Sequence, residues 1–192
     1  MRIVSGKLKG RVIRTPEGRS TRPTSDRARE AIFNVLAHAD WGVGLEGLRV
    51  MDLFAGSGAL GFEALSRGAA HCLFVETDAR ARGCIRDTTE QFQLFGATRI
   101  HRRSATDLGP RPAGLADGYD IAFMDPPYGY DLVGPALAQL LRGNWLKPQA
   151  LIVAETSKND PDPAHPGFDR LDTRDYGAAR MWFLRLAGSD PA

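Results

Sequence analysis

The part of this sequence best suited to chemistry is a carboxylate followed by two prolines and a tyrosine. Asp125-Pro126-Pro127-Tyr128 comes directly after residues 119–124, an apolar run typical of a buried strand. Prolines fix the backbone, so that the neighbouring side chains and carbonyls point in set directions. Asp125 and the Pro126 carbonyl can accept hydrogens from an exocyclic amine, and Tyr128 offers a flat face on which a base can stack. The tetrapeptide therefore predicts a site for the amine of a planar heterocycle.

Such an amine is a poor nucleophile because its lone pair is delocalised into the ring. Acceptors on its hydrogens favour the geometry in which the nitrogen becomes tetrahedral and positive, and they thereby stabilise the transition state of group transfer to nitrogen. Alignment of the donor carbon with the nitrogen adds to this effect. The chemistry requires no metal, and the four histidines and two cysteines show no metal-ligand spacing. The structural alternative is a Pro-Pro turn with a surface tyrosine.

A second candidate site is the glycine-rich loop in residues 52–61, DLFAGSGALG, which lies between an apolar run and a helical pattern. Gly56 and Gly58 let the backbone turn tightly and approach a ligand closely. Glu76 ends the next predicted strand, where a carboxylate can accept both hydroxyls of a ribose. Asp52 precedes the loop and suits a ligand that carries an ammonium group. The loop thus predicts a nucleotide-type ligand.

The spacing of the glycines leaves an alternative open. Gly56, Gly58 and Gly61 satisfy the pattern GxGxxG, which is typical of proteins that bind NAD or FAD. Asp52 counts against a pyrophosphate at this loop, because two negative charges repel each other. The chain also leaves little beyond one sheet domain, whereas a dehydrogenase usually needs a further substrate domain. A turn used only for packing is the structural alternative.

The charges are distributed unevenly along the chain. Residues 1–36 hold nine Lys or Arg and three acids, which gives +6, so the remainder carries −4 of the total +2. This asymmetry indicates a segment that meets a polyanion, with a solvated basic face as the alternative.

Composition narrows the class of protein. The 192 residues are 43% hydrophobic and 25% charged, as expected for one globular domain. The two cysteines form no disulfide framework, and no apolar run reaches the ~20 residues of a membrane span. The charged amino terminus lacks the apolar core of a signal peptide. We expect a cytoplasmic protein without a membrane partner, and the near-neutral net charge favours a monomer.

The elements that must position these residues alternate between short apolar runs and helical stretches, which indicates a mostly parallel sheet with crossover helices. A first helix is expected after a cap at Thr24 or Ser25. Residues 107–117 are too rich in Pro and Gly for a clear helix. Predicted strands lie at 48–54, 71–76, 98–102, 119–124 and 150–155, helices at 59–67, 78–95 and 131–142, a small basic hairpin or extended arm at 2–14, and an antiparallel last strand pair at 168–175 and 179–187.

Taken together, these motifs resemble a known family. DLFAGSGALG, VETD and DPPY in this order are similar to class I S-adenosylmethionine-dependent methyltransferases that act on amino nitrogens. The opening RIVSGKLKGR, the segment TRPTSDRAREAIFNVL, ALGFEALSRGA and the closing DYGAARMWFLRL resemble the RsmD family of bacterial 16S ribosomal RNA methyltransferases. The resemblance implies an α/β fold, in which a Rossmann-like seven-stranded sheet with an antiparallel last strand pair forms the middle of three α/β/α layers.

The resemblance also implies roles for individual residues. The reaction site would comprise Asp125, Pro126 and Tyr128. RNA phosphates would be held by Arg2, Lys7, Lys9, Arg11 and Arg14. The cofactor S-adenosylmethionine would be bound by Arg22, Thr24, Asp52, Phe54, Gly56, Ser57, Gly58, Glu76, Thr77, Ser104 and Ala105.

One position departs from the family pattern. Where the family commonly has Asp-Ala after the third strand to meet the adenine amine, this chain reads Arg103-Ser104-Ala105-Thr106-Asp107. Either Ser104 makes this contact, or Asp107 reaches the adenine from a shifted register.

The function implied by the resemblance is methyl transfer to N2 of guanine 966 in 16S ribosomal RNA, free or within a partly assembled small subunit. We expect a basic amino-terminal arm or hairpin at 1–23, a methyltransferase domain at 24–188 and a frayed tail at 189–192. Three rivals remain open: a DNA adenine or cytosine amino-methyltransferase, a non-catalytic RNA-binding assembly factor, and a small dinucleotide oxidoreductase.

Overall fold

The computed structural model describes residues 1–16, 26–115 and 118–188. Its helices are α1 (Asp26–His38), α2 (Ala59–Ser66), α3 (Ala79–Phe92) and α4 (Val133–Arg142). Its strands are β1 (Arg49–Leu53), β2 (His71–Val75), β3 (Thr98–His101), β4 (Tyr119–Met124), β5 (Leu146–Ser157), β6 (Phe168–Tyr176) and β7 (Ala179–Leu186).

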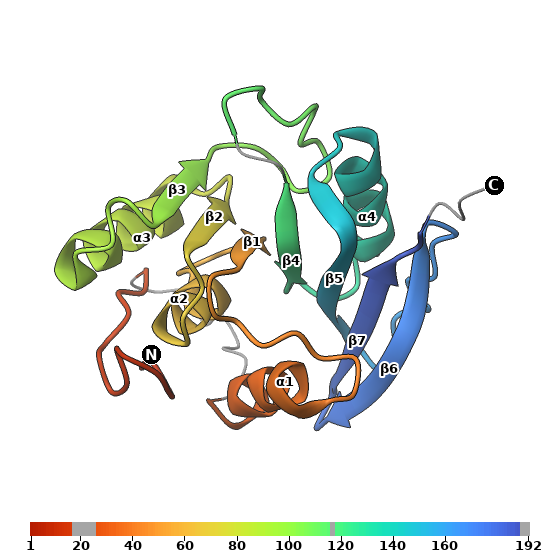
Figure 1. Cartoon of the computed structure of the whole chain (residues 1–192), viewed down its shortest axis with the longest axis horizontal. Helices are drawn as coiled ribbons and strands as arrows, with labels where there is room; N and C mark the ends of the chain where they lie inside the picture. Colours follow the sequence, from red (N-terminus) through yellow and green to blue (C-terminus); the bar gives the residue numbers. More distant parts are fainter. Residues whose placement is uncertain (17–25, 116–117, 189–192) are drawn as a thin grey trace.

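Within the described residues, the strands form one seven-stranded sheet in the order β3-β2-β1-β4-β5-β7-β6 (Figure 1). The first five strands pair in parallel, and β7 lies antiparallel between β5 and β6. The chain extends the sheet in one direction from β1 to β3 and then in the other from β4. Open α/β sheets bind ligands beside such a reversal, at the carboxyl ends of the strands. The predicted Rossmann-like fold and its antiparallel last pair are confirmed.

Two apolar cores hold the layers together. On one face of the sheet, α1, α2 and α3 pack against alternate strand residues such as Phe74 and Phe123. On the other face, α4 and the segment after β3 pack against Leu53, Met124 and Trp182. Because successive residues of a strand point to opposite faces, the apolar runs supply both cores at once. In the part of the chain described, no helix combines the length and apolarity needed to cross a membrane.

Several element boundaries differ from the predictions for local backbone reasons. α4 starts at Val133 instead of 131, because Asp131 has a φ of +48°, which does not fit a right-handed helix. α3 ends at Phe92 instead of 95, because Gln93 has a φ of +58° and adopts the left-handed conformation that ends a helix. β5 begins at Leu146 rather than 150, because Leu146 already pairs with Tyr119 of β4. The register of the two strands then shifts between Tyr119 and Ile121.

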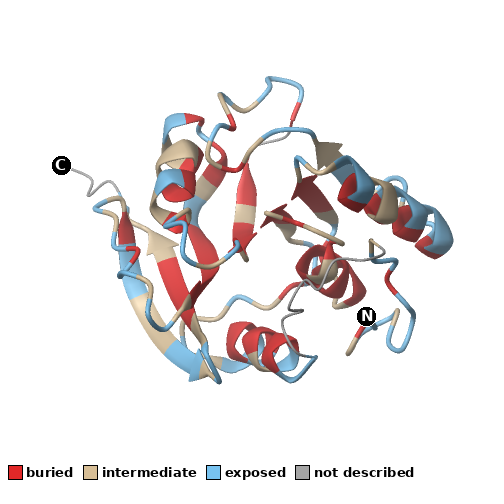
Figure 2. Cartoon of the chain, turned by 180° about the vertical axis from the view of Figure 1, so that it is seen from behind, coloured by how far each residue is buried: buried red, intermediate tan, exposed pale blue. Residues whose placement is uncertain are grey.

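The amino-terminal hairpin is fixed to the body of the protein. Arg2 and Val12 form an antiparallel bridge, while Ile3 and Ile13 are buried in the core next to α1 and α2. Figure 2 shows α2 buried along almost its whole length, in agreement with seven buried residues out of eight. α2 is therefore covered by the sheet on one side and by the hairpin on the other.

Candidate active site

Three carboxylates meet at the carboxyl ends of neighbouring strands. Asp52 lies near the end of β1, Glu76 follows β2, and Asp125 follows β4. Burial raises the pKa of Asp52 well above its ordinary value of 3.8, and the negative charges of Asp125 and Glu76 raise it further. The fold thus brings together the carboxylates of both sequence motifs and concentrates negative charge at one edge of the sheet.

Two of these carboxylates also shape the glycine loop. Glu76 accepts hydrogen bonds from the amides of Gly56, at 2.7 Å, and of Asp78, at 2.8 Å. Asp52, only 2% exposed, accepts one from the Gly61 amide at 2.9 Å. Gly61 lies in the first turn of α2, whose amides have no partner within the helix. Asp52 therefore stabilises the start of α2 from a neighbouring strand.

The loop requires glycine at different positions for different physical reasons. A Cβ on Gly61 would approach Phe74 Cε1 to 2.3 Å, so this glycine allows α2 to pack closely on β2. A Cβ on Gly56 would meet no atom within 4 Å, although its φ of +54° favours glycine. The backbone at Gly56 therefore faces open space. Phe54, a non-glycine residue with a φ of +60°, begins this bend at the end of β1.

The reaction-site motif is held by a neighbour on β5. Asp125 is half-buried, Pro126 is buried, and Tyr128 donates a hydrogen bond from its hydroxyl to Glu155 Oε1. Tyr128 and Glu155 line a small hollow together with Pro126 and Thr156. The hydrogen bond to Glu155 thereby holds the tyrosine side chain beside this hollow.

The other predicted cofactor residues fall into three groups. Ser57 is half-buried and Thr77 is exposed. Gly58 is buried and is the N-cap of α2. Ser104 and Asp107 form an isolated bridge in one tight turn, so the structure keeps both near the end of β3, and Ala105 is buried between them. Arg22 and Thr24 lie outside the described residues.

Comparison with known proteins identifies the family. A family model described as "Conserved hypothetical protein 95" matches residues 1–185. The chain belongs to this family, the RsmD family. It is 37% identical over 190 residues to the Bacillus subtilis protein YlbH, covering 98% of this chain and 100% of that protein.

Further relatives agree. Ribosomal RNA small subunit methyltransferase D of Haemophilus influenzae is 34% identical over 162 residues, which cover 84% of this chain and 81% of that protein. The solved structure of the Escherichia coli protein yhhF superposes with a TM-score of 0.79 at 30% identity, covering 97% of each chain.

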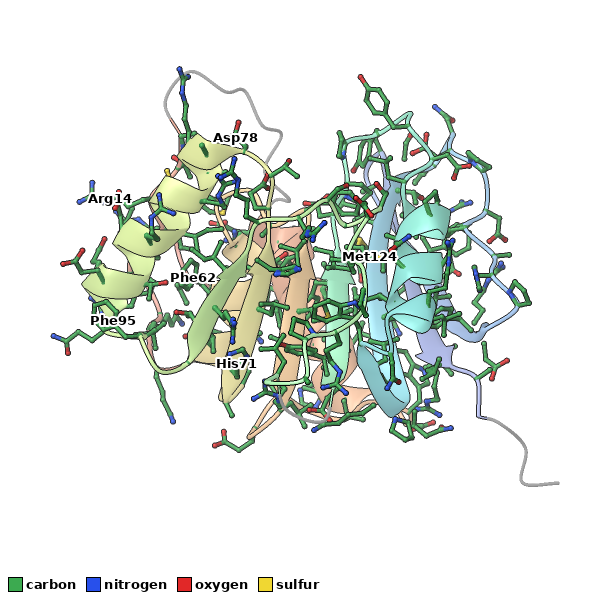
Figure 3. All side chains as sticks on the ribbon, turned by 90° about the horizontal axis from the view of Figure 1, so that it is seen from above. Arg14, Phe62, His71, Asp78, Phe95 and Met124 are labelled. Carbon is green, nitrogen blue, oxygen red and sulfur yellow. The ribbon has the colours of Figure 1, made fainter. Side chains whose placement is uncertain are left out.

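The predicted RNA-contacting residues lie on the hairpin of this RsmD-family chain and are exposed: Arg2, Lys7, Lys9, Arg11 and Arg14. The Arg14 amide donates to Thr88 Oγ1, and the Arg11 guanidinium lies 4.4 Å from the Phe92 ring centre. Figure 3 shows Arg14 beside α3. The hairpin is therefore attached to both α2 and α3 and presents its charges from a fixed position.

Sequence reasoning missed two residues of the site. Arg82 is buried and donates to the carbonyls of Glu76 and Thr77, so it holds the segment that follows β2. Glu155 ends the apolar run of residues 150–154, just as Glu76 and Asp125 end theirs. An acid that ends an apolar strand is the signal that would have found Glu155.

Proposed function

We propose that this protein transfers a methyl group from S-adenosylmethionine to the N2 amine of a guanine in 16S ribosomal RNA, with guanine 966 as the expected target. The observation that carries the proposal is the convergence of Asp52, Glu76 and Asp125 around an open glycine loop, beside a fixed Tyr128. The family relative from Haemophilus influenzae, named a small-subunit ribosomal RNA methyltransferase, supports RNA as the substrate.

The residues present fit the proposed cofactor. S-adenosylmethionine carries a sulfonium and an ammonium group, and the neighbouring carboxylates of Asp52 and Glu76 favour positive charge. Asp52 would face the ammonium group. Glu76 would accept the ribose hydroxyls in addition to its two backbone amides, since a carboxylate offers about four acceptor sites. The backbone at Gly56 has room for close approach.

When bound, S-adenosylmethionine supplies a methyl group activated by the sulfonium. Asp125 and the Pro126 carbonyl would accept the two hydrogens of the N2 amine, which stabilises the nitrogen as it becomes tetrahedral. Tyr128 would stack on the base and hold the nitrogen in line with the methyl carbon. The nitrogen would take over the methyl group from the sulfur and would then pass one proton to the Asp125 carboxylate, which already accepts that hydrogen. No residue forms a covalent intermediate in this scheme.

The same proposal assigns the hairpin to RNA docking. Its exposed lysines and arginines would neutralise phosphates, and the carboxyl edge of the sheet would receive an unpaired guanine. Ribosomal RNA as substrate places the protein in the cytoplasm, and we expect it to act as a monomer on free RNA or on an assembling small subunit.

The test is a tritium transfer assay that compares 16S ribosomal RNA, small subunits and duplex DNA, followed by mass mapping of the methylated nucleotide. We expect label in RNA, on guanine N2. The variant Asp125→Ala should lose at least about 100-fold in rate while binding the cofactor as the wild type does. Asp169→Ala, which removes an exposed carboxylate on β6, is the matched control. Transfer to DNA adenine, or full activity of Asp125→Ala, contradicts the proposal.

A further inference from the structure

Three arginines lie at the edge of the sheet that β3 forms. Arg99 belongs to this strand, Arg102 and Arg103 follow its last residue, and all three are exposed. Among the described strands only β2 pairs with β3, so the other side of β3 is an edge of the sheet. Residues 98–106 contain no acid. The function proposed above uses none of these three residues, which we call the β3 arginines.

The opposite edge of the same sheet shows how this protein accommodates exposed arginines elsewhere. On β6 and β7 each of three arginines forms an ion pair: Arg170 with Asp162, Arg174 with Asp172, and Arg180 with Asp175. The side chains of the β3 arginines form no ion pair or hydrogen bond with any residue that the structure describes. The chain therefore neutralises its arginines at one edge of the sheet and leaves the positive charge at the other edge to a partner.

The β3 arginines are close enough to act together. Burial lowers the pKa of His101, and the positive charges of Arg103 and Arg99 lower it further. Both guanidinium groups therefore lie near the same imidazole ring, and Arg102 lies between them in the chain. Like charges that no acid neutralises repel one another, and a bound anion relieves this repulsion. The cluster thus favours an anionic ligand.

The cluster adjoins the candidate active site. His101 pairs with Val75 of β2, and its carbonyl accepts a hydrogen bond from the Glu76 amide at 3.2 Å. Arg102, the next residue, is therefore at the same carboxyl edge of the sheet as Glu76. The hairpin is attached to α3, and Figure 1 shows α3 beside β3 at this end of the sheet. Basic side chains thus occur at this end both on the hairpin and on the edge formed by β3.

The residue type indicates which anion the cluster suits. An arginine guanidinium can donate two parallel hydrogen bonds to a phosphate and can stack on an unpaired base, whereas a lysine acts as a point charge. Several arginines along the edge of a strand fit a ligand that presents phosphates at regular intervals, as a nucleic acid does. Phosphate contacts at two separate places fix the orientation of a nucleic acid as well as its position.

We propose that the β3 arginines form a second RNA-binding surface, which binds phosphates next to the active site while the hairpin binds other phosphates of the same RNA. This inference rests on the proposed methylation of ribosomal RNA. It assigns to the β3 edge the part of the RNA that lies nearest to the cofactor, because Arg102 and Glu76 are at one edge of the sheet.

The test is filter binding of 16S ribosomal RNA at several salt concentrations to Arg99→Gln/Arg102→Gln/Arg103→Gln. We expect binding to weaken about 10-fold or more and the slope of log K against log salt to fall by about 2.1–2.7, since each phosphate contact contributes 0.7–0.9. The matched control Arg170→Gln/Arg174→Gln/Arg180→Gln removes the same charge from the opposite edge. It should keep the wild-type slope, because these side chains are already paired. Equal losses of slope in the two variants would show an effect of net charge alone and would overturn the inference.

Two further measurements separate RNA contact from other roles. Arg99→Lys/Arg102→Lys/Arg103→Lys keeps the charges and should keep the slope, whereas a lost slope in this variant would indicate a structural role and contradict the inference. In calorimetry the glutamine variant should bind S-adenosylmethionine within about 2-fold of the wild type, because exposed charges are screened. If it changes cofactor affinity and keeps the RNA slope, the arginines balance the carboxylates of the site, and the inference is wrong.

Failure of this inference and failure of the proposed function give different results. If the wild type methylates 16S ribosomal RNA and the glutamine variant has the wild-type slope, the proposed function stands and the β3 arginines do not contact RNA. If the wild type transfers methyl groups only to duplex DNA, the proposed function itself fails.

Discussion

Asp52 shows how one side chain serves both the fold and the site. Its carboxylate is 2% exposed and accepts the Gly61 amide, and its pKa is raised by burial and by two neighbouring carboxylates. Ionisation of Asp52 therefore costs more in the folded protein than in the unfolded chain, where its pKa is near 3.8. A ligand with an ammonium group would offset this cost by pairing with the charge.

The sign of the pH dependence follows from the raised pKa. Below about pH 3.8 Asp52 is protonated in both states and costs nothing. As the pH rises through the folded pKa, the wild type loses stability that Asp52→Asn retains. We expect Asp52→Asn to melt higher than the wild type at pH 7.5, with a smaller difference at pH 5. In calorimetry it should bind S-adenosylmethionine about 10-fold or more weakly. Equal melting curves at pH 7.5 would contradict this account.

Tyr128 and Glu155 show the same principle at the predicted reaction-site motif. A tyrosine on a loop has several rotamers, and the hydrogen bond to a buried carboxylate selects one of them. The sequence places Tyr128 in the motif, while Glu155 fixes which way its ring faces.

At the scale of elements, α2 connects the glycine loop to the hairpin. Gly58 caps its start, and on its outer side Glu63 accepts hydrogen bonds from the amides of Val4 and Ser5, at 2.8 and 3.0 Å, and from Arg67 Nε at 2.8 Å. Glu63 is fully buried. Two backbone amides of the hairpin therefore donate their hydrogen bonds to a side chain of α2, the helix that follows the glycine loop of the candidate site.

Removal of this carboxylate should separate the hairpin from the body. Glu63→Ala leaves three donors without an acceptor, so we expect the free energy of unfolding to fall by about 3 kcal/mol. Trypsin should then cut more rapidly after Lys7 and Lys9. Glu90→Ala, which truncates an exposed glutamate on α3, is the control and should change stability by less than about 0.5 kcal/mol. Urea denaturation gives both values, and equal losses in the two variants would show that Glu63 does not hold the hairpin.

At the scale of the whole molecule, the exposed positive charge of the hairpin and the candidate site lie on different parts of the protein. The hairpin carries exposed basic side chains, whereas the carboxyl edge of the sheet carries Asp52, Glu76 and Asp125. Under the proposed function, long-range attraction to RNA and local binding of the cationic cofactor would therefore not compete for the same residues.

This separation predicts how salt affects RNA binding. Lys7 and Lys9 are exposed on the hairpin, and each phosphate contact releases counterions. We expect Lys7→Gln/Lys9→Gln to bind RNA more weakly and to lower the slope of log K against log salt by about 1.4–1.8. Arg142→Gln on α4, exposed on the opposite face of the sheet, should leave the slope unchanged. Filter binding at several salt concentrations measures both, and an unchanged slope in the double variant would exclude these lysines from RNA contact.

Local pattern was enough to predict the elements that carry the site. The run 119–124 and the break at Pro126 place Asp125 at a strand end, and the glycines after residue 53 place a loop before α2. These signals are local, because strand periodicity and proline geometry depend on nearby residues alone. The predicted end of α3 and start of α4 were wrong because Gln93 and Asp131 adopt a left-handed conformation. The residue type alone does not predict this conformation for a non-glycine residue.

The sequence by itself thus determined the order of the strands along the chain, the two motifs and the basic hairpin. Only the tertiary structure decided which side chains meet: Glu155 with Tyr128, Glu63 with the amides of the hairpin, and Asp52 with the start of α2. These pairs are 9 to 59 residues apart and come together only when the strands assemble. The physical reason is that a buried polar group needs a hydrogen-bond partner, and the fold can supply that partner from a distant part of the chain. The spacing of residues along the sequence does not show which residue this partner will be.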